Sequence, residues 1–226
     1  MERAPGRGAN RPSGGQPAGV TQADPATFIA RHLPLGAVPG ICGIRLHHAT
    51  PGSGLHRLLG DDAPPPYWAY RWGGGLALAR YLADHPQAVR GRRVLDLGAG
   101  SGLVAIAAAR AGAVRVEAAE VDPHAIAALR LNAVANDVTL AIRHADLLDG
   151  PAPAIDVLLV GDLFYDPGLA ERTAAFCARC RAEGIAVLIG APFRAPLPQH
   201  RLTLLATYEV EEIAGQPRPA GVFAFR

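Results

Sequence analysis

A glycine-rich turn between two largely apolar segments is the first part of this 226-residue chain that could bind a ligand. Gly98, Gly100 and Gly102 follow the segment 94–97 and precede the apolar run 103–109. Glycines allow positive φ angles and a close approach to the backbone, and a helix N-terminus attracts anionic or polar groups. A buried strand, a tight turn and a helix in this order predict a site for a nucleotide-like ligand. A turn that binds nothing is the simpler alternative.

The glycine spacing and an acid further along the chain narrow the kind of ligand. A dinucleotide-binding loop has its third glycine one position later, where this chain has Leu103. Glu120 ends the next expected strand, about 20 residues after Gly98, where a carboxylate can accept hydrogen bonds from both ribose hydroxyls. We therefore expect S-adenosyl-L-methionine rather than NAD as the ligand. An exposed acid at a strand end is the alternative for Glu120.

Three further segments could contribute side chains to the same site. Asp146 follows the third strand of the expected sheet and could hold an adenine amino group, or it could simply form a turn. Segment 161–166 places acids and aromatic rings after the fourth strand, at the edge where reactive loops of such sheets gather. The alternative is that Asp162 caps a turn and the aromatic rings fill the core. Segment 64–75 holds four aromatic residues between prolines and glycines, and it could be a ligand-contacting wall or a packed lid.

The elements that must position these residues alternate between strands and helices. Such alternation predicts an α/β fold with a doubly wound, mostly parallel seven-stranded sheet and helices on both faces, a Rossmann-like arrangement. We expect an antiparallel pair at the end of the sheet, and a loop over 51–60. The expected strands are 41–47, 93–97, 115–120, 139–143, 155–160, 185–189, 201–210 and 221–225. The expected helices are 27–32, 102–111, 123–136, a segment after Trp72 ending at His85-Pro86, and one from Pro167 to Gly184.

Composition places limits on domain organisation and partners. Residues 1–24 are rich in Gly, Pro, Ala and Arg and are expected to be disordered, although a transit peptide is an alternative; residues 25–226 are expected to form one domain. A net charge of +2 and the absence of a long apolar run argue against nucleic acid and membrane partners. Three cysteines suggest a reducing compartment, the cytoplasm, and we expect a monomer. All 22 basic residues are arginine, so the chain has no lysine of its own.

Two features resemble metal or redox sites but are better explained otherwise. Cys177 and Cys180 have a C-x-x-C spacing inside an expected helix, whereas a redox pair lies at a helix N-terminus. A zinc site would need two more ligands, and Cys42 is the only other cysteine. The eight histidines are scattered, and His47-His48 reads as a strand pair. We expect no metal.

Four segments together give the chain a family resemblance: 66–74, 94–102, 120–123 and 161–165. With them the chain resembles class I, seven-strand S-adenosylmethionine-dependent methyltransferases from about Phe28 to its C-terminus. Within that class it is most similar to the lysine methyltransferases of the electron-transfer flavoprotein β-subunit. The segment 94–102 identifies only the broad class, whereas 161–165 and 66–74 narrow it to enzymes that methylate proteins.

The resemblance implies a role for each matching residue. Gly98, Gly100, Glu120 and Asp146 would hold the cofactor, with Trp72 packed beside it. Asp162 and Tyr165 would act as catalytic residues that orient a lysine amine. The neighbours expected to complete the cofactor site are Asp96, Ala99, Gly102, Val121 and Leu147. The residues expected to border the protein substrate are Phe164, Tyr165 and Trp72.

The chain departs from the family after the fifth strand. Segment 190–194 has Ala191 and Phe193 where the family usually has Asp and Gly, so this loop need not make the family's usual contacts. Three alternatives stay open: methylation of another protein such as a ribosomal protein, an NAD-dependent oxidoreductase, and a binding module that has lost catalysis.

Overall fold

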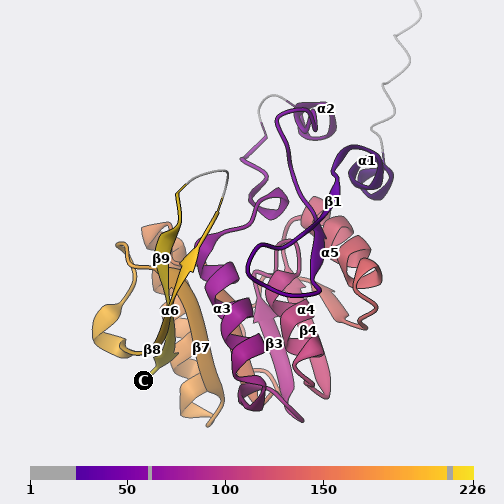
Figure 1. The fold of residues 1–226 in the computed structure, drawn as a ribbon. Helices are drawn as coiled ribbons and strands as arrows, with labels where there is room; N and C mark the ends of the chain where they lie inside the picture. The colour runs from indigo at the N-terminus through magenta and orange to yellow at the C-terminus, as the bar shows by residue number, and fades with distance from the viewer. Residues whose placement is uncertain (1–23, 61–62, 213–215) are drawn as a thin grey trace, which may run out of the picture.

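The computed structural model describes residues 24–60, 63–212 and 216–226, and its centre is a single mixed sheet. The strands are β3 (Arg93–Leu97), β4 (Arg115–Glu120), β5 (Ala141–His144), β6 (Val157–Gly161), β7 (Ala186–Pro192), β8 (Leu202–Val210) and β9 (Arg218–Phe225). They lie in the order β5-β4-β3-β6-β7-β9-β8 (Figure 1). Only β9 runs antiparallel to its neighbours β7 and β8. This confirms the expected doubly wound, mostly parallel seven-stranded sheet.

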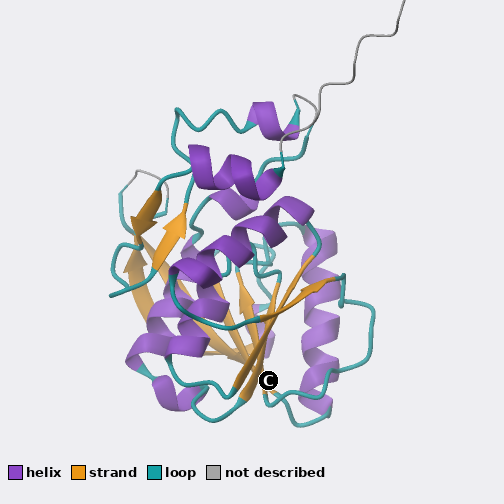
Figure 2. Cartoon of the chain, turned by 90° about the vertical axis from the view of Figure 1, so that its right-hand side faces the viewer, coloured by secondary structure: helices purple, strands orange, loops and turns teal. Residues whose placement is uncertain are grey.

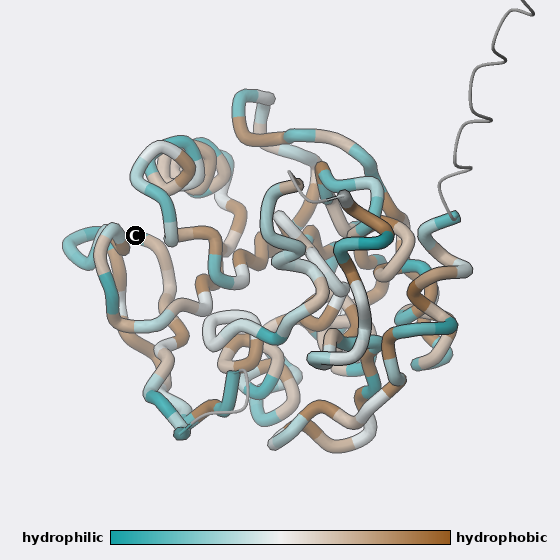
Figure 3. Tube along the Cα trace, turned by 90° about the horizontal axis from the view of Figure 1, so that it is seen from above, coloured by the Kyte–Doolittle hydropathy of each residue, from teal (hydrophilic) through white to brown (hydrophobic). Residues whose placement is uncertain are grey.

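Helices cover both faces of the sheet, which confirms the expected layers (Figure 2). On one face, α3 (Gly73–Asp84), α4 (Leu103–Arg110) and α5 (Pro123–Ala135) pack their apolar side chains against the sheet. On the other face lies α6 (Pro167–Ala182), whose Phe176, Cys177 and Cys180 are fully buried. Along the chain, hydrophobic and hydrophilic stretches alternate over short distances, as expected when elements bury one side and expose the other (Figure 3).

The N-terminal part differs most from expectation. It contains α1 (Pro25–His32), a small hairpin of β1 (Leu35–Ala37) and β2 (Arg45–His47), and α2 (His56–Leu59). The expected strand 41–47 is therefore too long and β1 was missed, because a three-residue strand shows too little periodicity to detect. The expected loop over 51–60 is also wrong, since it contains the single helical turn of α2.

Two buried asparagines, Asn132 in α5 and Asn136 at its C-cap, hold the hairpin in place. The Oδ1 atom of Asn132 accepts the backbone N–H of His47 at 2.8 Å, and its Nδ2 donates to the carbonyl oxygen of Ser101 at 2.8 Å. The side chain of Asn136 bonds both backbone groups of Arg45. The N-terminal hairpin and the glycine loop therefore share one anchor, Asn132, which is fully buried.

The remaining differences are small or fall outside the described residues. The expected strand 139–143 begins two residues late and ends at His144, and 155–160 begins two residues late and ends at Gly161. Except for Asp24, which caps α1, the expected disorder of 1–24 lies outside the described residues. No helix in the described part of the chain is long and apolar enough to cross a membrane.

Candidate active site

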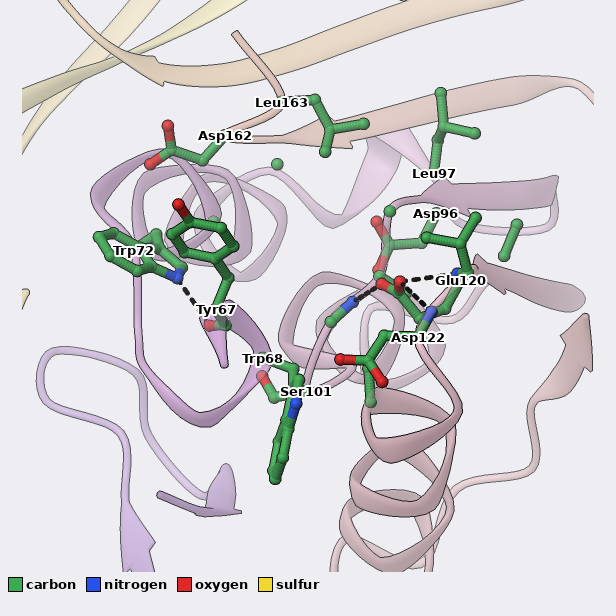
Figure 4. A pocket seen from close by; sticks show the side chains of 18 of the residues that line it. Tyr67, Trp68, Trp72, Asp96, Leu97, Ser101, Glu120, Asp122, Asp162 and Leu163 are labelled. Atoms are coloured by element: carbon green, nitrogen blue, oxygen red, sulfur yellow. Dashed lines mark hydrogen bonds between the residues drawn. The ribbon is translucent and has the colours of Figure 1, made fainter. Parts of the chain in front are cut away.

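A cavity of about 690 Å³ opens at the carboxyl ends of β3, β4 and β6 (Figure 4). β3 lies between β4 and β6, so the later strands extend the sheet on one side through β4 and on the other side through β6. Ligands bind at such a reversal of strand order in open α/β sheets. The volume suits a small-molecule site. Of the predicted site residues, all except Gly102 and Phe164 line this cavity. The structure thus brings together side chains from five separate segments.

The glycine loop offers its backbone to the cavity at Gly100. Gly100 has a φ of +53°, and a Cβ added there would meet only the Cα of Trp68, at 3.7 Å. Gly102 has a different role, because a Cβ there would overlap the side chain of Leu129. Gly102 is the N-cap of α4 and lies outside the cavity lining. The structure therefore gives Gly102 a packing role rather than the expected place in the ligand site.

Asp96 supports the loop from below. Its Oδ2 accepts the backbone N–H of Ala105 at 2.9 Å, which caps α4 because Gly102 has no side chain to do so. Asp96 is 1% exposed, and burial, with the nearby charge of Glu120, raises its pKa to about 8. The carboxyl group lines the cavity floor, and its hydrogen bond is to the backbone of α4.

The Glu120 carboxylate accepts hydrogen bonds from the backbone of two segments, the glycine loop and the residues that follow β4. Its Oε2 accepts the N–H of Gly100 at 2.8 Å, while its Oε1 accepts those of Val121 at 2.7 Å and Asp122 at 3.1 Å (Figure 4). These bonds fix the carboxylate and tie the end of β4 to the glycine loop. Each carboxylate oxygen can accept two bonds, so Oε2 keeps one lone pair for a ligand hydroxyl.

Asp146 reaches the cavity from the loop after β5 and is held by Arg172 of α6. Its Oδ2 lies 2.8 Å from Nη2 of Arg172, and its Oδ1 accepts the N–H of Leu148 at 3.0 Å. The hydrogen bond from Arg172 is the main reason that the pKa of Asp146 is lowered. Leu147 also lines the cavity. Arg172 was not predicted, because nothing in the sequence spacing links it to Asp146.

Aromatic rings form the opposite end of the cavity. The ring of Tyr67 lies edge-on to Trp72, with centroids 5.7 Å apart, and tilted against Tyr165, with centroids 5.4 Å apart. Nε1 of Trp72 donates to the carbonyl oxygen of Tyr67 at 2.7 Å, which fixes the indole. In Figure 4, Trp72 and Tyr67 lie near Asp162, across the pocket from Glu120 and Asp96. Segment 64–75 is thus part of the cavity wall.

Asp162 sits at the junction of three elements beside these rings. It follows β6 directly with a φ of +60°, a left-handed conformation that aspartate tolerates better than most residues. Its Oδ2 accepts the N–H of Gly74 at 3.0 Å, and its Oδ1 lies 2.7 Å from Nη2 of Arg194. Burial raises the pKa of Asp162, against the effect of both bonds. Burial also raises the pKa of Tyr165, so its phenol stays protonated at neutral pH.

Phe164 must be corrected. We expected it to border the substrate, but it is 1% exposed and packs with Leu158, Val160 and Phe176 in the core between the sheet and α6. Its neighbours Leu163 and Tyr165 turn toward the cavity instead. The alternation of side chains along segment 163–165 explains the difference, because one residue in two faces the core.

Sequence reasoning missed Arg194 as well as Arg172, and it placed Trp68 only within the possible wall 64–75. Arg194 reaches the cavity from the end of β7, within the segment that departs from the family pattern, and it binds Asp162 despite Ala191 and Phe193. Trp68 also lines the cavity, and its buried Nε1 has no hydrogen-bond partner among the described residues. The signal available for Arg194 was its position shortly after the end of the expected strand 185–189.

Comparisons with known proteins relate this chain to methyltransferases. The chain is 38% identical over 205 residues to the electron transfer flavoprotein beta subunit lysine methyltransferase of Xenopus laevis, covering 87% of this chain and 83% of that protein. It is 42% identical over 153 residues to the Rattus norvegicus protein of the same name, spanning 65% of this chain and 60% of that one. A family model described as ribosomal protein L11 methyltransferase (PrmA) matches residues 81–163.

One solved structure shows the same fold. The T. thermophilus 16S rRNA N2 G1207 methyltransferase, in complex with AdoMet and guanosine, superposes with a TM-score of 0.54 at 22% identity. The match covers 85% of this chain and 51% of that one. At this identity the likeness concerns the fold alone.

Proposed function

Because this chain belongs to the electron transfer flavoprotein beta subunit lysine methyltransferase family, we propose that it methylates a lysine of that subunit with S-adenosyl-L-methionine as methyl donor. The chain is a protein-lysine methyltransferase by its relatives, and the substrate and donor are our proposal. The names of the relatives support the substrate, and the residues at the cavity support the donor. We propose that the enzyme acts as a cytoplasmic monomer, which its free Cys42, Cys177 and Cys180 fit.

The residues at the β3 and β4 end of the cavity fit S-adenosyl-L-methionine. The open backbone at Gly100 leaves room for a ligand against the loop, and Glu120 keeps an acceptor lone pair beside it. Asp146 supplies a second carboxylate further along the same floor. When bound, S-adenosyl-L-methionine supplies a methyl group attached to a positively charged sulfur. Gly98, Gly100, Glu120 and Asp146 would hold it, as the sequence predicts.

The aromatic end of the cavity suits a lysine side chain. A lysine must lose its proton before it can attack a methyl group, and with a pKa near 10.4 this costs about 4 kcal/mol at about pH 7.5. Trp72, Tyr67 and Tyr165 form aromatic walls that fit a long aliphatic chain. We propose that Asp162 and the protonated Tyr165 orient the amine by hydrogen bonds, so that much of the rate comes from positioning.

One observation carries this proposal: a single cavity joins the Glu120 and glycine-loop end to the Asp162 and aromatic end. A donor and an acceptor bound at these two ends would meet inside one cavity. A binding module without catalysis would not need a second polar end lined by fixed aromatic rings.

The experiment replaces Asp162 by asparagine. Asparagine can still accept the N–H of Gly74, although its NH2 group then faces Nη2 of Arg194 and the ion pair is lost. Asp162→Asn should keep the affinity for S-adenosyl-L-methionine, which binds at the other end of the cavity, while methyl transfer falls by about 100-fold. Methyl transfer to purified electron transfer flavoprotein beta subunit is followed by mass spectrometry, and binding by calorimetry. Every methyl-lysine found must come from the substrate, because this chain contains no lysine.

Asp84→Asn is the matched control, because Asp84 lies at the other end of α3 and its carboxylate accepts the hydroxyl of Tyr208. It should transfer methyl groups at the normal rate. Near-normal turnover by Asp162→Asn would refute the role of Asp162. Failure of the native chain to methylate any lysine of the subunit would refute the proposed substrate.

A ribosomal protein is a second candidate substrate. The match of residues 81–163 to the ribosomal protein L11 methyltransferase model favours it. That segment holds the glycine loop and Glu120 but ends before Tyr165, so it bears on the donor site more than on the acceptor site. Offering ribosomal protein L11 and the flavoprotein subunit in equal amounts would decide between them by the ratio of methylation rates.

A further inference from the structure

The ion pair between Arg194 and Asp162 is the contact in the cavity that the reaction as described does not use. Nη2 of Arg194 lies 2.7 Å from Oδ1 of Asp162, and both side chains line the cavity. Asp162 is almost completely buried, whereas the Arg194 side chain is 42% exposed. Arg194 therefore covers one oxygen of the carboxylate from the solvent side.

Other charged or titratable groups lie near the pair or line the same cavity. Glu212, after β8, accepts the N–H of Gly73 at 2.8 Å and adds a negative charge near Asp162. Arg71 lines the cavity with its own counter-charge, Glu211. The phenols of Tyr67 and Tyr165, whose rings contact each other, line the same cavity. Arg194 is thus the only described cation whose side chain bonds Asp162.

A bare carboxylate would hinder the proposed reaction. A negative charge within a few ångströms favours the charged form of an amine and holds its proton. In a buried site this effect is stronger than in water. A carboxylate that is already paired with a guanidinium presents almost no net charge, while each of its oxygens can still accept another hydrogen bond. The paired form can orient an uncharged amine without attracting an ammonium.

We propose that Arg194 is a positioning residue that keeps the target lysine uncharged by neutralising Asp162. This inference rests on the proposed function and adds a positioning residue to the same site. Arg194 need not touch the amine, since it acts through the carboxylate. It explains why a half-exposed arginine lines a cavity that is proposed to receive a lysine side chain.

The first test counts protons released when the substrate binds. The complex is formed with S-adenosylhomocysteine in place of the methyl donor. This compound carries no sulfonium charge and permits no methyl transfer. Calorimetry of binding to the electron transfer flavoprotein beta subunit, in two buffers of different ionisation enthalpy at about pH 7.5, gives the proton count. The native enzyme should release close to one proton per bound lysine, and release of none would overturn the inference.

The second test changes the charge of Arg194. Arg194→Gln keeps a donor for Asp162 but removes the charge, and Arg194→Met serves if the glutamine variant does not fold. The apparent pKa in the pH profile of kcat should move up by about one unit or more, with about a tenfold slower rate near pH 7.5 and recovery at high pH. The same variant should release fewer protons on binding. Arg194→Lys should behave as the native chain does.

Arg130→Gln is the matched control, because Arg130 is exposed on α5 and lies outside the cavity lining. It should change neither measurement. A purely structural role for Arg194 would lower kcat equally at every pH, and that result would overturn the inference while leaving the proposed function intact. Absence of lysine methylation by the native chain would overturn both.

Discussion

Replacing Glu120 by glutamine should weaken binding of S-adenosyl-L-methionine without unfolding the chain. In the structure, Oε2 accepts the N–H of Gly100 at 2.8 Å, and Oε1 accepts two further N–H groups, from Val121 and Asp122. An amide can place its oxygen on the side of Val121 and Asp122. Its NH2 group then faces the N–H of Gly100, where two donors meet and no hydrogen bond forms.

The magnitude follows from the bonds that are lost. A hydrogen bond to a charged group contributes about 1.5–3 kcal/mol, and the variant loses the acceptor proposed for a ribose hydroxyl. This corresponds to an increase of about 10- to 150-fold in the Kd for S-adenosyl-L-methionine. The lost bond to Gly100 should lower the free energy of unfolding by about 1–3 kcal/mol, which leaves most of a typical domain's stability.

Calorimetric titration with S-adenosyl-L-methionine measures the Kd, and chemical denaturation measures the stability. The matched control is Glu117→Gln on the same strand, since Glu117 pairs with Arg115 and Arg143 and lies outside the cavity. It should leave the Kd unchanged. A Glu120→Gln variant that binds within about twofold of the native chain would show that this carboxylate does not contact the ligand.

Two further predictions concern residues that support the site. Asn132→Ala should lower the free energy of unfolding by about 2–4 kcal/mol, because the partly buried N–H of His47 and the buried C=O of Ser101 both lose their partner. A loss below about 1 kcal/mol in denaturant titrations would contradict this. Burial raises the pKa of Asp96 from 3.8 to about 8, so the folded state keeps a proton that the unfolded state releases. The stabilisation by protonated Asp96 is therefore complete at low pH and is lost as the pH rises from the unfolded to the folded pKa. Asp96→Asn should flatten the pH dependence of Tm. An equal slope in the native chain and the variant would contradict it.

The parallel strands and the cavity floor follow from patterns within short stretches of sequence. The apolar run before Gly98, the glycines and the acid about 20 residues later predict β3, the turn, α4 and the end of β4. Because parallel strands end at one edge, these local patterns also predict that Glu120 and Asp162 share a site. The short hairpin of β1 and β2 escaped prediction, since three-residue strands hold little pattern and depend on Asn132 and Asn136 for support.

The sequence by itself determined the fold class, the glycine-rich turn after β3 and the family to which the chain belongs. It could not determine which side chains meet when residues far apart in the sequence pack together. Asp162 and Arg194 are 32 positions apart, and Asn132 and His47 are 85 positions apart. Only the tertiary structure turned Phe164 into the core and placed a guanidinium on the proposed catalytic carboxylate. Hydrophobic periodicity and glycine spacing act locally, whereas charge pairing in a cavity depends on the packing of several elements at once.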